Sequence, residues 1–115
     1  MVLTQPYQPN SAEEQTLVRM LGACKLSADQ YHILPLQQGQ QIAWHKLRAH
    51  FTPRYVLLLG IHPALLGIAA QFRLHEANHY DDTTFIPALS LAEMEQQPEA
   101  KKEFWAKGLK PTFVP

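Results

Sequence analysis

The chain has 115 residues, ten basic and ten acidic side chains that cancel, and a single cysteine, Cys24. This length supports one domain, residues 1–115, and a formal net charge of zero gives no overall field that would attract a nucleic-acid backbone. A lone cysteine excludes an internal disulfide, and no apolar run approaches the roughly 20 residues of a membrane span. The N-terminus lacks the charge and apolar length of a signal peptide, so we expect a cytoplasmic protein that does not enter a membrane.

The first ten residues predict an irregular segment or a short edge strand, because Val2-Leu3-Thr4 is soon followed by two prolines. A helix is predicted to begin at Ser11, where Ser11-Ala12-Glu13-Glu14 forms a capping-box pattern. Its apolar residues recur at helical spacing, at Leu17, Met20, Leu21 and Cys24. Because Cys24 lies on this stripe, we expect a small buried hydrophobe and not a reactive thiol.

A strand, a loop and a second helix are predicted next. Tyr31–Leu36 is apolar enough for a largely buried strand, whose ladder Pro35 limits. The glutamine-rich stretch from Gln37 to Gln41 predicts a solvated loop. From Ile42 onward, apolar residues again recur at helical spacing, at Ala43, Trp44, Leu47 and Phe51. This pattern predicts a surface helix packed on a sheet.

The run Tyr55–Leu59 predicts the central strand. Its five apolar residues show no polar alternation, which is typical of a parallel sheet covered on both faces. Gly60 lets the backbone turn sharply, and Pro63–Ala70 predicts a helix with proline in its first turn. Ligand sites in such sheets lie at the carboxyl ends of strands, so a site is expected at Gly60, Ile61 and His62. For His62, a helix-capping role is expected before a catalytic one.

The C-terminal part predicts a last strand and two helices. Thr83–Pro87 is β-branched and aromatic, and Asp81-Asp82 turns into it. Ser90-Leu91-Ala92-Glu93 is a second capping box, which opens a short helix. Pro98 begins the final helix, and Gly108 followed by Pro111 is expected to end it. The charged and aromatic face of this helix is either simply solvated or a partner-binding patch; it consists of Lys101, Lys102, Trp105 and Lys107.

The stretch His75-Glu76-Ala77-Asn78-His79 fits the pattern H-E-x-x-H, which on a helix binds zinc through two histidines with the glutamate as general base. The pattern lacks a third ligand at the spacing of the common zinc-protease signatures. It also requires the helix from Pro63 to run unbroken to Tyr80. A minimal zinc metallopeptidase using His75, His79 and Glu76 is therefore the alternative, and no cofactor is expected for the preferred function.

Three stretches occur in an order and spacing typical of one known family. Ser27-Ala28-Asp29-Gln30-Tyr31-His32-Ile33 is similar to its "edvYItN" motif, Pro53–Gly60 to "PkvivaLG", and Thr84–Trp105 to the closing "TyHPSaLLr.p..K...W". Over roughly Ser11 to Lys110, the chain thus resembles the uracil-DNA glycosylase fold, particularly its family 4 branch. The resemblance implies a three-layer α/β/α sandwich with a mainly parallel central sheet of about four strands.

The chain departs from this family where the family carries its chemistry. Ile86 stands where the family has a histidine before Pro87, and an isoleucine cannot stabilise a developing anion. Pro35 stands where an asparagine would read the extruded base. The loop that positions the attacking water has no counterpart, and Cys24 alone cannot replace the four cysteines of the family's iron–sulfur cluster. The resemblance therefore implies a degenerate, non-catalytic fold, with any residual ligand site at Gly60, Ile61, His62 and Pro87.

The segment from Pro87 to Trp105 is also similar to the psi subunit family of bacterial DNA polymerase III, which has this fold without an active site. That resemblance implies a protein-binding role in DNA replication or repair, with clamp-loader components as partners. Contact with nucleic acid stays open. The sequence also leaves open homodimerisation and base excision by a divergent DNA glycosylase that acts through His62.

Overall fold

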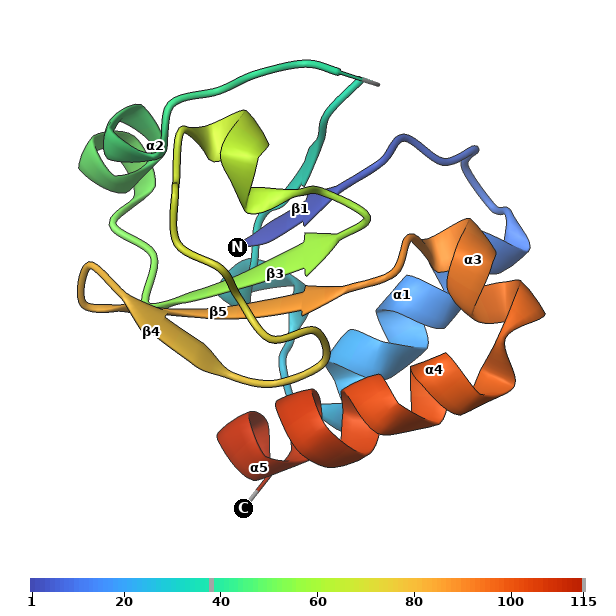
Figure 1. The fold of residues 1–115 in the computed structure, drawn as a ribbon. Coiled ribbons are helices and arrows are strands. Elements are labelled where there is room, and N and C mark those ends of the chain that lie inside the picture. Colours follow the sequence, from blue (N-terminus) through green and yellow to red (C-terminus); the bar gives the residue numbers. More distant parts are fainter. Residues whose placement is uncertain (38, 115) are drawn as a thin grey trace.

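The computed structural model describes residues 1–37 and 39–114. Within them, five strands form one sheet in the order β2-β1-β3-β5-β4 (Figure 1). The strands are β1 (Val2–Thr4), β2 (Ile33–Pro35), β3 (Tyr55–Leu59), β4 (Asn78–Tyr80) and β5 (Thr83–Ala88). Neighbouring strands are parallel except β4 and β5, which are antiparallel. The predicted mixed α/β fold with a mainly parallel sheet is confirmed, although the sheet has five strands and not about four.

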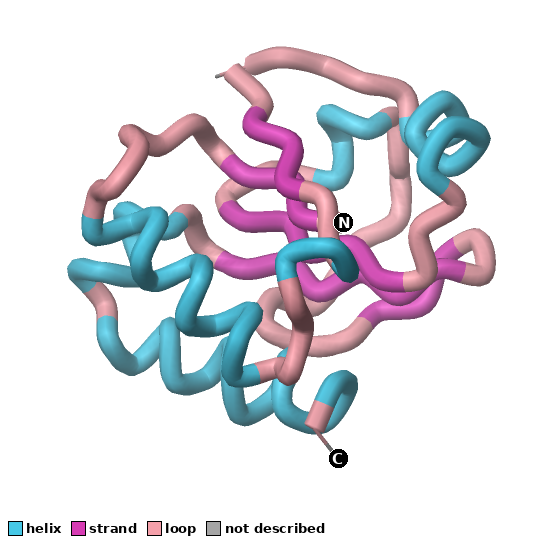
Figure 2. The backbone as a smooth tube through the Cα atoms, turned by 180° about the vertical axis from the view of Figure 1, so that it is seen from behind, coloured by secondary structure: helices cyan, strands magenta, loops and turns pink. Residues whose placement is uncertain are grey.

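Helical segments lie on both sides of the strands (Figure 2). The α-helices are α1 (Ala12–Ala23), α2 (Trp44–Phe51), α3 (Leu91–Gln96), α4 (Pro98–Glu103) and α5 (Lys110–Phe113). Two 3₁₀ turns, η1 (Ala28–Gln30) and η2 (Pro63–Leu66), and a π-helical segment, η3 (Phe104–Leu109), complete the order. In the part of the chain described, no helix combines the length and the apolar character needed to cross a membrane.

The side chains of strand β3 belong alternately to two apolar clusters, one on each face of the sheet. Leu57 and Leu59 belong to an apolar cluster shared with α1, α3 and the C-terminal helix, which consists of α4, η3 and α5. Val56 and Leu58 belong to a second cluster, shared with α2 and η2. Successive side chains of a strand point to opposite faces, so an uninterrupted apolar run buries both faces. The prediction of a central strand covered on both sides is thus confirmed.

Strand β1 lies inside the sheet, and its expected position at an edge is wrong. Val2, Leu3 and Thr4 pair with β2 on one side and with β3 on the other, and all three are buried. A run of three residues is long enough here because both neighbouring strands satisfy its backbone groups. The following prolines limit its length but do not decide its place in the sheet.

The C-terminal helix runs through Gly108 and Pro111, so the predicted end at these residues is wrong. The Lys110 amide donates to the carbonyl of Trp105, five residues back, and α5 follows with Pro111 in its first turn. Pro111 cannot donate a backbone hydrogen bond, but the helix continues past it, and the Val114 amide donates to the Lys110 carbonyl at 2.9 Å. A Cβ added at Gly108 would lie 2.7 Å from Ile86 Cγ2 and 2.8 Å from the His75 carbonyl oxygen. Gly108 therefore permits close packing and does not terminate the helix.

Two local predictions fail between β3 and β5. The helix expected over Pro63–Ala70 is only the short turn η2, which Gly67 ends with a φ of 73°. Strand β4 was not predicted, and it pairs with β5 through a two-residue turn in which Asp81 and Asp82 have φ values of 53° and 61°. Two successive left-handed residues are typical of a type I′ hairpin turn. The loop predicted from Gln37 to Gln41 is free of helix and strand where it is described, and Gln38 lies outside the described residues.

Candidate functional site

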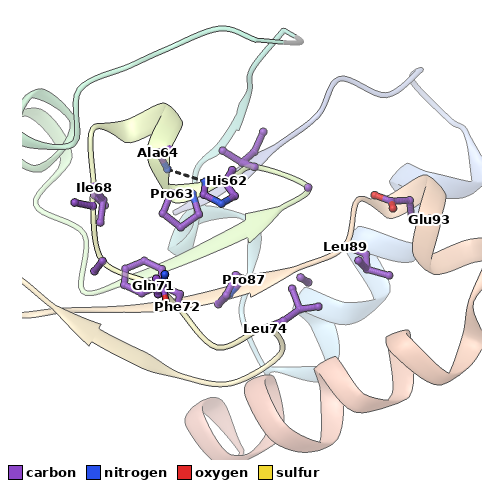
Figure 3. A pocket seen from close by; sticks show the side chains of 15 residues that line it. His62, Pro63, Ala64, Ile68, Gln71, Phe72, Leu74, Pro87, Leu89 and Glu93 are labelled. Carbon is purple, nitrogen blue, oxygen red and sulfur yellow. Dashed lines mark hydrogen bonds between the residues drawn. The ribbon is translucent and has the colours of Figure 1, made fainter.

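A pocket of about 710 Å³ lies at the carboxyl ends of β3 and β5 (Figure 3). We call it the strand-end pocket. The four residues predicted for a ligand site, Gly60, Ile61, His62 and Pro87, all line it. The remaining wall comes from the start of η2, the loop between Ile68 and Leu74, the end of β5 and the start of α3. The structure therefore brings the predicted residues together in one concave surface.

Gly60 holds the chain segments at this end of the sheet together. Its φ of 72° is left-handed, and an added Cβ would lie 2.7 Å from Ser90 Cβ. The Gly60 amide donates to the Ala88 carbonyl at 3.0 Å, and the Gln5 side-chain amide donates to the Gly60 carbonyl at 3.1 Å. Since only glycine fits this approach without strain, Gly60 fixes the turn that forms the pocket.

The lining of the strand-end pocket is mainly apolar. Ile61 and Pro87 are buried in its base, Phe72 is half-buried, and Leu74 at the rim is 47% exposed. Concave apolar surfaces with few polar groups are typical of binding sites. The arrangement suits an apolar group more than a charged one.

Two titratable side chains line the strand-end pocket, and both cap helical turns. His62 Nδ1 accepts a hydrogen bond from the Ala64 amide at 3.1 Å, which is the capping role expected from the sequence. Glu93 Oε1 accepts from the Ser90 amide at 3.3 Å, while Ser90 Oγ accepts from the Glu93 amide at 3.2 Å. In Figure 3 Glu93 lies on α3 at one end of the pocket, and His62 lies apart from it, next to Pro63. They are therefore not arranged as an acid–base pair around a common point.

The H-E-x-x-H stretch does not lie on a helix, so it lacks the geometry that the zinc-binding alternative requires. His75 sits in a turn with a φ of 67°, and β4 begins at Asn78. The His75 side chain is buried, with Nδ1 3.3 Å from Glu103 Oε1, whereas His79 is exposed and its Nδ1 lies 3.2 Å from Thr84 Oγ1. The described residues contain no group of three His, Cys, Asp or Glu side chains placed to hold a metal ion.

The predicted partner-binding face lies on the C-terminal helix, away from the strand-end pocket. Trp105 is half-buried against the core, and Lys102 and Lys107 are exposed. Lys107 Nζ lies 3.4 Å from Glu103 Oε1. The hydrogen bond from His75 and that from Lys107 both lower the pKa of Glu103. With Lys101 partly buried, this face presents separate charged side chains.

Cys24 is buried at 2% exposure, as predicted, and burial raises the pKa of its thiol from 9.0 to about 11. A protonated thiol inside the core is a poor nucleophile. Cys24 therefore contributes packing and no chemistry.

A second pocket, of about 350 Å³, lies at the opposite end of the sheet, and sequence reasoning missed it. We call it the amino-end pocket. Its aromatic lining residues come from separate parts of the chain, namely Tyr31, Phe51, Tyr55 and Phe113. No spacing within one segment connects them, so a local pattern could not have revealed the pocket.

Comparison with protein-family models and with curated proteins finds no match to this sequence.

Proposed function

We propose that this chain is a non-enzymatic binding module, a protein-interaction subunit connected with DNA replication or repair in the manner of the psi subunit. In this proposal its α/β fold is a degenerate three-layer sandwich of the uracil-DNA glycosylase type. The strand-end pocket is its binding site, and clamp-loader components are its partners.

The observation that carries the proposal is the chemistry of the strand-end pocket. Its surface is mainly apolar, and its two titratable side chains, His62 and Glu93, each accept a backbone hydrogen bond as caps. General acid–base catalysis requires a titratable group within hydrogen-bond reach of the reacting atoms, usually oriented by a partner. An apolar pocket with a partly exposed rim is instead typical of a site that receives a side chain of another protein.

The positions that differ from the glycosylase pattern support the same conclusion. Ile86 is fully buried in the cluster beside the C-terminal helix, where it contributes to packing. Pro35 is exposed at the end of β2 and has no side-chain donor. Neither residue offers a polar group to a nucleobase.

The test is a binding measurement between the purified chain and purified clamp-loader subunits. We expect Leu74→Glu to weaken binding at least tenfold, because it places a charge at the rim of the apolar pocket, where an interface would desolvate it. The matched control is Val18→Glu, since Val18 on α1 is a similarly exposed apolar residue, at 51% against 47% for Leu74. Val18→Glu should bind like the native chain.

Equal binding by both variants, or no binding by the native chain, would contradict the proposal. A uracil-release assay on single-stranded and double-stranded DNA tests for the enzyme. Base release that is lost in His62→Ala would favour a divergent glycosylase instead.

A further inference from the structure

The amino-end pocket has an apolar floor and an aromatic wall. Val2, Leu21 and Leu57 lie in the floor and are buried core residues. In the wall, the rings of Tyr55 and Phe113 are 5.0 Å apart at an interplanar angle of 59°. A second pair of rings in the lining, those of His32 and Phe51, are 5.6 Å apart. These tilted pairs favour the burial of a further apolar or aromatic group beside them.

The lining of this pocket includes one arginine, Arg54, and one histidine, His32. Arg54 and His32 are both exposed, and no carboxylate side chain is among the described lining residues. Arg54 also borders a small surface pocket with Asp81 and Asp82, but both carboxylates pair with Arg48, at 3.1 Å and 4.0 Å. Within the described chain, Arg54 forms no ion pair.

Asp29, which lies three residues before His32, does not neutralise this charge at the pocket. Asp29 Oδ1 accepts a hydrogen bond from Ser27 Oγ at 2.5 Å, and this bond is the main cause of its lowered pKa. Asp29 is not among the residues that line the pocket. The rim is therefore complementary to a negatively charged partner.

We propose that the amino-end pocket binds a protein segment that inserts one aromatic or large aliphatic side chain and places an adjacent carboxylate beside Arg54. A volume of about 350 Å³ is at the small end for a complete small-molecule site but suits a single anchoring side chain. Tyr55 is 36% exposed, so part of the aromatic wall is available to a partner. Arginine suits this role because its planar guanidinium binds a carboxylate through two parallel hydrogen bonds.

This site is separate from the strand-end pocket, and its occupant need not be the same protein. The inference therefore goes beyond the proposed function, and either can fail without the other. Binding that is sensitive to Leu74→Glu tests the strand-end pocket, whereas Arg54 variants test the amino-end pocket.

The experiment uses two short capped peptides of glycine and serine, one with a central Trp-Glu pair and the other with Trp-Lys. Each is titrated into the ¹⁵N-labelled chain and followed by NMR. We expect the Trp-Glu peptide to shift the amides of Tyr31, Tyr55 and Phe113 and to bind about tenfold more tightly than the Trp-Lys peptide, the factor that corresponds to one charge-assisted pair. Arg54→Glu should reverse this preference. Arg73→Glu, which makes the same charge change at an exposed residue outside the lining, should keep it.

Several results would overturn the inference. They are equal affinity of the native chain for both peptides, no shift with either peptide, or shifts confined to the residues of the strand-end pocket. If the chain elutes at twice its 13.1 kDa and an Arg54→Glu variant elutes as a monomer, a second copy and not a foreign segment occupies the pocket.

Discussion

Two glycine-to-alanine substitutions in helices should have opposite effects on stability. Gly22 is exposed in the last turn of α1, and an added Cβ would meet no atom within 4 Å. Alanine is favoured over glycine by about 1 kcal/mol in a helix interior and by less near a helix end, so Gly22→Ala should stabilise the chain by about 0.5 kcal/mol. Gly108 is also helical, but it is buried, and the added Cβ would approach Ile86 Cγ2 to 2.7 Å and the His75 carbonyl to 2.8 Å.

The second clash cannot be relieved by a side-chain rotation, because it involves backbone. The His75 loop is itself fixed, since the His75 amide donates to the Pro87 carbonyl at 2.8 Å. Overpacking costs about 1–3 kcal/mol and outweighs the helical gain, so Gly108→Ala should lose about 1–2 kcal/mol of the free energy of unfolding. Urea denaturation of the three proteins measures both changes. If Gly108→Ala proved as stable as Gly22→Ala, the close packing of the C-terminal helix on the His75 loop would be wrong.

The remaining predictions concern a buried thiol and a hairpin turn. Above pH 9 the thiol of Cys24 ionises in the unfolded chain but stays protonated in the folded chain up to a pKa of about 11, so stability should fall by about 2–3 kcal/mol across this interval. Cys24→Ala should abolish that part of the pH dependence, and an unchanged profile would contradict the buried thiol. Asp81 accepts hydrogen bonds from Trp44 Nε1 at 3.0 Å and Arg48 Nη1 at 3.1 Å, whereas Asp82 reaches Arg48 only at 4.0 Å. Both aspartates have left-handed φ values, so Asp81→Ala and Asp82→Ala share the same backbone cost. Thermal unfolding should therefore show Asp81→Ala to be less stable than Asp82→Ala by about 1–3 kcal/mol, because only Asp81 loses these hydrogen bonds. Equal losses would show that Asp81 does not hold α2 to the hairpin.

Features that depend on a few neighbouring residues could be predicted from the sequence. Ser90 and Glu93 form the predicted capping box in both directions. At the first capping box, Ser11 Oγ accepts from the Glu14 amide as expected, but Glu14 Oε1 accepts from the Asn10 amide and not from Ser11. The reach of these side chains fixes where the two helices begin. The sequence pattern leaves open only which backbone amide, Asn10 or Ser11, donates to the Glu14 carboxylate.

Features that depend on distant pairing could not be predicted. Val2–Thr4 has the same local pattern whether it lies at an edge or inside a sheet, and only its pairing with β2 and β3 distinguishes the two. Likewise, Gly108 and Pro111 are helix-ending residues by local preference. The π-helical segment and the packing of Gly108 on the His75 loop overrule that preference.

The two pockets also differ in how far the local sequence could reveal them. Gly60, Ile61 and His62 directly follow β3, so the rule that sites lie at the carboxyl ends of parallel strands was sufficient to suggest them. Pro87 was suggested by the family resemblance, and the lining between Ile68 and Leu74 was not predicted. The amino-end pocket is built from the end of η1, the end of α2, the start of β3 and α5. Its aromatic residues each have an ordinary local explanation as core side chains, and only the fold brings them to one rim.

The sheet order explains why the strand-end pocket lies beside β5. The chain leaves β1 through α1 on one face and returns to β3 through α2 on the other, so the direction of winding changes between β1 and β3. Open α/β sheets usually bind ligands in the crevice at that point. Here the Gln5 side chain, directly after β1, bonds across it to the Gly60 carbonyl at 3.1 Å. The strand-end pocket lies next to that point, between β3 and β5, where the buried residues Ile61 and Pro87 contribute to its lining. In the proposed binding function, this apolar surface beside the crevice would receive a partner's side chain, and Leu74→Glu at its rim tests that role.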